Sequence, residues 1–100
     1  MEVCTLASGS RGNSLLICCG STYVLLDAGI SARRITSALK ALGADPTRLS
    51  AVLVTHEHTD HVSGLATLTK QLGVPVYATA PTLDRLERKV TELARLGRTL

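Results

Sequence analysis

Residues 51–61 read Ala-Val-Leu-Val-Thr-His-Glu-His-Thr-Asp-His, and this stretch holds all three histidines of the 100-residue chain. Its first five residues are apolar or β-branched, which predicts a buried strand. After the histidines, residues at the spacing of one helix face follow: Val62, Leu65, Ala66, Thr69 and Leu72. We therefore expect the histidine cluster on a loop that joins a strand to a helix.

The side chains of this loop are suited to metal binding. On extended backbone, His56 and His58 can converge on one cation, while Asp60 and His61, at the helix entry, point to a neighbouring position. Imidazole nitrogen suits zinc, manganese and iron, and a carboxylate suits the harder of these ions. We expect these four residues to be metal ligands, Asp60 to serve catalysis as well, and Glu57 to point away from the metals. The alternative is a polar loop with unrelated histidines, which is disfavoured because three imidazoles rarely cluster by accident.

The remaining segments alternate between strand and helix patterns. Strands are expected at residues 2–7, 15–19, 22–27 and 74–78, with a tight turn at Gly20-Ser21. Helices are expected from an N-cap at Ser31 to a C-cap at Gly43, from the histidines to Gly73, and from Pro81 to Gly97. Successive apolar residues such as Val24-Leu25-Leu26 indicate strands that are covered on both faces.

Residues 56–61 resemble the metal-binding motif of the metallo-β-lactamase superfamily. Two further stretches narrow the branch: Thr5–Ser14 is similar to the opening strand and glycine-rich loop of WalJ-type (YycJ-type) metallohydrolases, and Leu25–Ser31 to their aspartate-containing strand end. The three stretches stand in the family's order. The resemblance implies an α/β fold that is the N-terminal half of an αββα sandwich, with one mixed sheet and helices on one face.

The same resemblance implies that residues 1–100 are the N-terminal portion of a single metallo-β-lactamase domain whose C-terminal half is absent. The family takes further histidines and a bridging aspartate from that half. Here no histidine lies outside the motif, and Asp84, the only aspartate after it, falls in a predicted helix. We expect each metal site to be half complete, and we expect the sheet face that a second sheet covers in the family to be bare.

The resemblance also implies roles for residues outside the motif. The aspartate that matches Asp27 lies beneath the metal loop in the family and orients it, although an ordinary turn or capping aspartate is the alternative. Ser10 and Asn13, in the glycine-rich loop, could hold a phosphate oxygen of the substrate, or the loop could be an ordinary turn. The implied cofactors are two divalent metal ions, zinc or manganese, that share an activated water.

The implied activity is phosphodiester hydrolysis, with DNA exonuclease action as its sharpest form, so the expected partner is a nucleic acid or another phosphodiester. The alternatives are a small-molecule phosphodiesterase of the PhnP-like branch and an inactive truncated fragment. The oligomeric state is left open. The two tyrosines are the only aromatic residues apart from histidine, so the chain offers few aromatic side chains on which nucleic-acid bases could stack.

The chain carries a net charge of +3, and its last predicted helix is rich in basic residues: Arg85, Arg88, Lys89, Arg95 and Arg98. These residues could face phosphate, but a solvated helix face is favoured because Glu87 and Glu92 are interleaved with them.

Three cysteines, Cys4, Cys18 and Cys19, show no metal-ligand spacing, and their odd number argues against a disulfide framework. We expect them to be small buried strand residues in a reducing compartment. No signal-peptide pattern precedes the first strand, and no apolar stretch approaches the roughly 20 residues of a membrane span. The expected location is the cytoplasm, without membrane contact.

Overall fold

The computed structural model describes residues 1–9 and 12–100, and for Thr59 and Asp60 it describes the backbone only. The described residues contain one six-stranded sheet in the order β1-β2-β3-β4-β5-β6. The strands are β1 (Glu2–Ala7), β2 (Ser14–Cys19), β3 (Thr22–Leu26), β4 (Leu49–Leu53), β5 (Val76–Ala78) and β6 (Gly97–Thr99). The helices are α1 (Ala32–Ala41), the 3-10 helix η1 (Pro46–Arg48), α2 (Thr59–Val62), α3 (Leu65–Leu72), α4 (Ala80–Glu87) and α5 (Leu93–Leu96).

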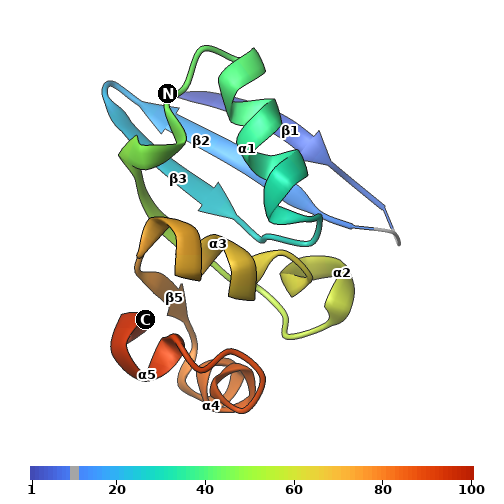
Figure 1. Ribbon diagram of the computed structural model, residues 1–100, viewed down its shortest axis with the longest axis vertical. Helices are drawn as coiled ribbons and strands as arrows, with labels where there is room; N and C mark the ends of the chain where they lie inside the picture. Colours follow the sequence, from blue (N-terminus) through green and yellow to red (C-terminus); the bar gives the residue numbers. More distant parts are fainter. Residues whose placement is uncertain (10–11) are drawn as a thin grey trace.

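The sheet is mixed, as expected. Strands β1, β2 and β3 form an antiparallel meander, and β3, β4, β5 and β6 run parallel to one another. Cys19 pairs with Thr22 across the turn at Gly20-Ser21, where Gly20 takes a φ of 60° that favours glycine. Each parallel connection passes through helical segments, and α1 and α3 lie across the same face of the sheet (Figure 1).

One apolar core lies between the sheet and the helices. Strands β2 to β5 contribute buried side chains to it, and so do helices α1, α3, α4 and α5. The largest fully buried apolar side chains are Leu16, Leu25, Val52 and Val76 from the strands and Ile35, Leu39, Leu65, Leu68, Leu86 and Leu93 from the helices. Burial of this kind contributes about 25 cal/mol per Å² of apolar surface removed from water.

The opposite face of the sheet is also apolar but is only half-buried. Its side chains alternate with those of the core, and cross-strand pairs set them side by side: Leu15 with Leu26, Ile17 with Val24, and Leu26 with Leu53. Among the described residues, the helices therefore cover one face of these strands, and the other face is only half-buried. The second face carries a half-buried apolar stripe.

The prediction of one final helix from Pro81 to Gly97 is wrong. Helix α4 ends at Glu87, α5 is a separate short helix, and Gly97 begins β6, which pairs in parallel with β5. The break follows Lys89 with Val90 and Thr91, two β-branched residues that are poor helix formers. At Gly97 a Cβ would lie 2.7 Å from the carbonyl oxygen of Leu93, so glycine lets the chain turn closely into the sheet.

Other boundaries differ less. The strand before the histidines begins at Leu49 and ends at Leu53 rather than covering 51–55, and the segment after them forms two helices, α2 and α3. The caps agree with expectation: the Ser31 hydroxyl accepts from the Arg34 N–H, and Gly73 ends α3 in the left-handed region. No helix within the described ranges has the length and apolar character needed to cross a membrane.

Candidate metal centre

The histidine loop and Asp27 meet because β3 and β4 are parallel neighbours. Leu26 pairs with Leu53, so the residues that follow each strand leave the sheet at the same edge. Asp27 comes directly after β3, and Thr55 and His56 come shortly after β4. The backbone N–H of Asp27 donates to the carbonyl oxygen of Leu53 at 2.7 Å, which fixes the two strand ends together.

Asp27 is a buried carboxylate on an unusual backbone. It is 5% exposed and has a φ of 62°, a left-handed conformation that aspartate tolerates better than most residues. Its own carbonyl oxygen accepts a hydrogen bond from the Ser14 hydroxyl at 2.8 Å. These contacts hold the residue in place from both sides, as a buried polar group requires.

The carboxylate of Asp27 joins the strand end to the helix entry. Oδ1 accepts from the Thr55 backbone N–H at 2.8 Å, and Oδ2 accepts from the Thr55 hydroxyl at 2.7 Å. Oδ2 also lies 2.8 Å from Nδ1 of His61. Asp27 therefore links the end of β3 to the residue before the histidines and to the ring of His61. Thr55 was missed in the sequence, because a threonine before a histidine carries no signal of its own.

His61 is beside this carboxylate, and the other two imidazole rings lie near it on the same loop. The ring centroids of His56 and His61 are 4.9 Å apart, and those of His56 and His58 are 6.0 Å apart. A backbone hydrogen bond anchors the turn that carries His61: the carbonyl oxygen of His61 accepts from the Ala28 N–H at 2.8 Å. The contacts of His56 and His61 with Thr55 and Asp27 use Nδ1, so Nε2 is on the far side of each ring.

The donor chemistry of the loop fits a divalent metal ion. Imidazole nitrogen is a common ligand of zinc, and a metal-binding histidine typically directs its other nitrogen to a carboxylate or carbonyl, as His61 does here. Among the side chains that the structure describes, no three from His, Cys, Asp and Glu are close enough to hold an ion together. The side chain of Asp60, a predicted ligand, lies outside this description, and its backbone is in α2 beside His61.

Glu57 is turned to α4 rather than to the histidines. Its carboxylate oxygen lies 2.6 Å from Nη1 of Arg85. A hydrogen bond with its own backbone, together with Arg85, holds the pKa of Glu57 below its usual value. The pair tethers the histidine loop to a helix that follows it by more than twenty residues, and the sequence alone did not indicate it.

The predicted phosphate loop has a structural role at Asn13. The amide oxygen of Asn13 lies 3.2 Å from the Gly9 N–H, and its amide nitrogen donates to the Gly9 carbonyl at 2.9 Å, which closes the loop on itself. Gly12 packs tightly, because a Cβ there would lie 2.6 Å from the carbonyl oxygen of Gly29. Ser10 lies outside the described residues. A substrate contact by either Ser10 or Asn13 stays a prediction.

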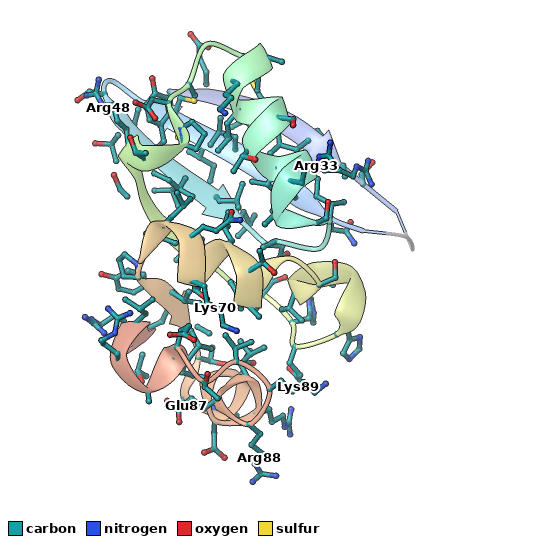
Figure 2. The ribbon with its side chains drawn as sticks, viewed as in Figure 1. Arg33, Arg48, Lys70, Glu87, Arg88 and Lys89 are labelled. Atoms are coloured by element: carbon teal, nitrogen blue, oxygen red, sulfur yellow. The ribbon has the colours of Figure 1, made fainter. Side chains whose placement is uncertain are left out.

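The basic residues near the C-terminal end are exposed, as expected of a solvated helix face. Arg88 and Lys89 extend outward at the end of α4 (Figure 2), and Arg88 is within 3.9 Å of Asp84 on the same helix. Nη1 of Arg98 donates to the backbone carbonyls of Arg95 and Gly97. Three of these basic side chains thus have local partners: Arg85 with Glu57, Arg88 with Asp84, and Arg98 with backbone carbonyls.

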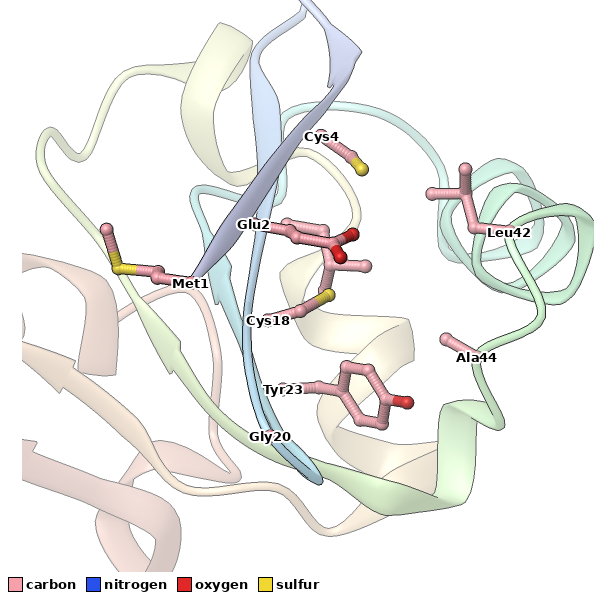
Figure 3. Close-up of a pocket in the computed structure, with 9 residues that line it drawn as sticks. Met1, Glu2, Cys4, Cys18, Gly20, Tyr23, Leu42 and Ala44 are labelled. Carbon is pink, nitrogen blue, oxygen red and sulfur yellow. The ribbon is translucent and has the colours of Figure 1, made fainter.

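A cavity of about 400 Å³ lies away from the histidines, between the antiparallel strands and the end of α1. Figure 3 shows Cys4, Cys18 and Tyr23 pointing into it, with Leu42 on the opposite wall. Burial, and to a lesser degree the neighbouring Cys4 and Glu2, raise the pKa of the Cys18 thiol. The three cysteines are free thiols, but the expectation that all are buried is wrong, since Cys19 is exposed.

Comparisons with known proteins agree with the sequence motifs. Residues 7–97 match the family described as the metallo-beta-lactamase superfamily. The chain is 42% identical over 82 residues to exodeoxyribonuclease WalJ of Streptococcus pneumoniae, which covers 82% of this chain and 30% of that protein. It is 38% identical over 85 residues to exodeoxyribonuclease YycJ of Bacillus anthracis, which covers 85% of this chain and 32% of that protein.

The fold is also similar to that of solved metallo-β-lactamases. A B3 metallo-β-lactamase with an active-site glutamic acid superposes with a TM-score of 0.75 at 31% identity, over 85% of this chain and 32% of that one. The chain thus spans about a third of the length of each of these proteins.

Proposed function

This chain belongs to the metallo-beta-lactamase superfamily, and from that membership we propose that the protein is a metal-dependent hydrolase that cleaves phosphodiester bonds in DNA. The resemblance to the WalJ/YycJ-type branch is confirmed by the identities to two proteins named as exodeoxyribonucleases. The observation that supports the metal role is the proximity of the His56 ring to those of His58 and His61, together with the contact of His61 with the buried Asp27 carboxylate. DNA as the substrate is supported by the names of those relatives.

In this proposal His56, His58, Asp60 and His61 are the ligands that this chain supplies to two divalent ions, zinc or manganese. Bound ions of this kind supply an activated water and neutralise the charge of the attacked phosphate. Asp27 holds the ring of His61 and the backbone of Thr55, so the loop keeps its shape before any ion binds. Glu57 and Arg85 hold the other side of the loop against α4.

A small phosphodiester is the alternative substrate. This stretch of the protein has no phenylalanine or tryptophan and only two tyrosines, so it offers few aromatic faces on which nucleic-acid bases could stack. A substrate bound mainly through its phosphate would need no such platform.

The test uses the full-length protein, stripped of metal with a chelator and then reloaded with zinc or manganese. Hydrolysis is measured on end-labelled single-stranded and double-stranded DNA, on a cyclic nucleotide and on bis(p-nitrophenyl) phosphate. The proposal predicts metal-dependent release of nucleotides from DNA, with the chelated protein inactive. Hydrolysis of the cyclic nucleotide without DNA cleavage would favour the small-substrate alternative. Hydrolysis of none of the phosphodiesters would reject the proposed function.

A further inference from the structure

The hydroxyl group of Thr55 lies between Asp27 and the ring of His56. Its oxygen, Oγ1, is 2.7 Å from Oδ2 of Asp27 and 3.0 Å from Nδ1 of His56. It is also 3.5 Å from Nδ1 of His61, at the limit of a hydrogen bond. A threonine hydroxyl has one proton to donate and two lone pairs with which to accept. The position of that one proton decides what the neighbouring ring can do.

The hydroxyl proton belongs in the bond to Asp27. A carboxylate only accepts hydrogen bonds, so a 2.7 Å contact between two oxygens requires the threonine to be the donor. If the proton faced His56 instead, two acceptor oxygens would oppose each other at that distance. The hydroxyl therefore presents a lone pair to Nδ1 of His56, and a favourable contact at 3.0 Å requires a proton on Nδ1. In the neutral ring, the nitrogen lone pair then lies on Nε2.

The same reasoning applies to His61, whose ring contacts the Asp27 carboxylate directly. Its Nδ1 is 2.8 Å from the Asp27 carboxylate, so this nitrogen is the donor, and in the neutral ring Nε2 carries the lone pair. Asp27 is buried, whereas Thr55 and His56 are exposed. The Thr55 hydroxyl thus connects the buried Asp27 carboxylate to the ring of His56 through two successive hydrogen bonds.

We propose that Thr55 is a positioning residue that sets the tautomer and the ring orientation of His56. One carboxylate then prepares two histidines for metal binding through Nε2, His61 directly and His56 through the Thr55 hydroxyl. The partner of one ring nitrogen determines whether the other nitrogen is available to a metal. The inference rests on the proposed metal role of His56, but the tautomer can be measured without metal or substrate.

The test is nuclear magnetic resonance of the metal-free, full-length protein with ¹⁵N-labelled histidine. Long-range ¹H–¹⁵N spectra should show a proton on Nδ1 of His56 in the wild type. Thr55→Ser keeps the hydroxyl and should keep this tautomer. Thr55→Val removes the hydroxyl at nearly constant volume and should lose the preference for it. Zinc affinity, measured by competition with a chromophoric chelator, should fall about 10 to 100-fold in Thr55→Val and stay close to wild type in Thr55→Ser.

Thr47→Val is the matched control, because the Thr47 hydroxyl also donates to an aspartate, Asp45, but away from the histidines. It should change neither the tautomer nor the zinc affinity. If Thr55→Val does not fold, the pair Thr55→Ala and Thr55→Ser makes the same comparison. A Thr55→Val protein that keeps both the Nδ1 proton and the wild-type zinc affinity would overturn the inference. The expected tautomers in a protein that hydrolyses no phosphodiester would support it and reject the proposed function.

Discussion

Asp27 shows how one residue can serve the backbone and the candidate site together. Its left-handed backbone ends β3, its main chain bonds to Leu53 and Ser14, and its carboxylate bonds to Thr55 and His61. Because Asp27 follows an apolar strand, the sequence predicted that its carboxylate needs hydrogen-bond partners. The identity of those partners could not be predicted, because Thr55 and His61 approach only after β3 and β4 have paired.

Replacing Asp27 by asparagine should weaken metal binding with little change in the backbone. Asparagine accepts the left-handed conformation, but its amide group places a donor where Thr55 or His61 also donates. We expect metal affinity to fall by about 10 to 100-fold, the usual loss when the partner of a metal-binding histidine is removed. Metal titration of the soluble full-length variant measures this fall.

Asp45→Asn provides the control, since Asp45 is an exposed aspartate that caps η1 through the Thr47 N–H. It should bind metal like the wild type. A purely structural role for Asp27 would instead appear as complete loss of folding in Asp27→Asn, seen by circular dichroism.

His58 is expected to be required for hydrolysis and dispensable for folding. It is exposed, and it lies on the loop after β4 rather than in the apolar core. In the full-length protein His58→Ala should reduce phosphodiester hydrolysis to background and leave the circular dichroism spectrum unchanged. Retained activity with normal metal content would remove His58 from the candidate site. Lys70→Ala, an exposed change on α3, should leave activity unaltered.

At the scale of elements, close packing between α3 and the segment after β3 shapes the loop. Gly64 precedes α3, its N–H donates to the Ala28 carbonyl at 2.8 Å, and a Cβ there would collide with the Ile30 carbonyl oxygen. Because that neighbour is backbone, it has little freedom to move aside. Glycine at position 64 therefore allows the start of α3 to pack closely against the segment that follows β3.

Gly64→Ala should destabilise the full-length protein by about 1–3 kcal/mol, the usual range for overpacking at a tightly packed position. Metal affinity should fall as well, because the displaced segment carries Ala28, whose N–H bonds to His61. Chemical denaturation measures the free energy of unfolding. The neighbouring exposed Ser63→Ala should be nearly neutral. Equal stability of the two variants would show that the segments are not packed as described.

The elements differ in how well the sequence predicted them. The first three strands, α1 with its Ser31 cap and the loop position of the histidines follow from local pattern, so they could be predicted to within a few residues. Strand β6 could not, because three residues, Gly97–Thr99, carry no strand pattern and form one only by pairing with β5. The Glu57–Arg85 pair was missed for the same reason, since it joins elements that are distant in sequence.

At the scale of the whole molecule, the two faces of the sheet have different surroundings. One face lies beneath the helices, and the other presents half-buried Leu15, Ile17, Val24, Leu26 and Leu53. Contiguous exposed apolar surface well above a few hundred Å² marks an interface or a tendency to aggregate. Because core and stripe residues alternate along each strand, a one-residue slip in pairing would move the core residues to the other face of the sheet.

The 100 residues expressed alone should therefore self-associate, bind zinc or manganese weakly and turn over no phosphodiester. Weak binding is expected because this stretch supplies only two predicted ligands to each metal position, and an incomplete set of ligands leaves an ion loosely held. Analytical ultracentrifugation, metal stoichiometry and a DNA cleavage assay measure the three properties. A monodisperse monomer that holds two tightly bound ions and cleaves DNA would contradict this expectation.

The account depends on one central claim, that the histidine loop binds a divalent metal with rings oriented by Asp27 and Thr55. Anomalous diffraction from crystals of the zinc-loaded full-length protein tests it most directly. We predict zinc density about 2.0–2.1 Å from Nε2 of His56 and of His61, with Nδ1 of each ring facing Thr55 and Asp27 respectively. Zinc bound at the cysteines instead, or coordinated through Nδ1 of His56 or His61, would contradict the claim.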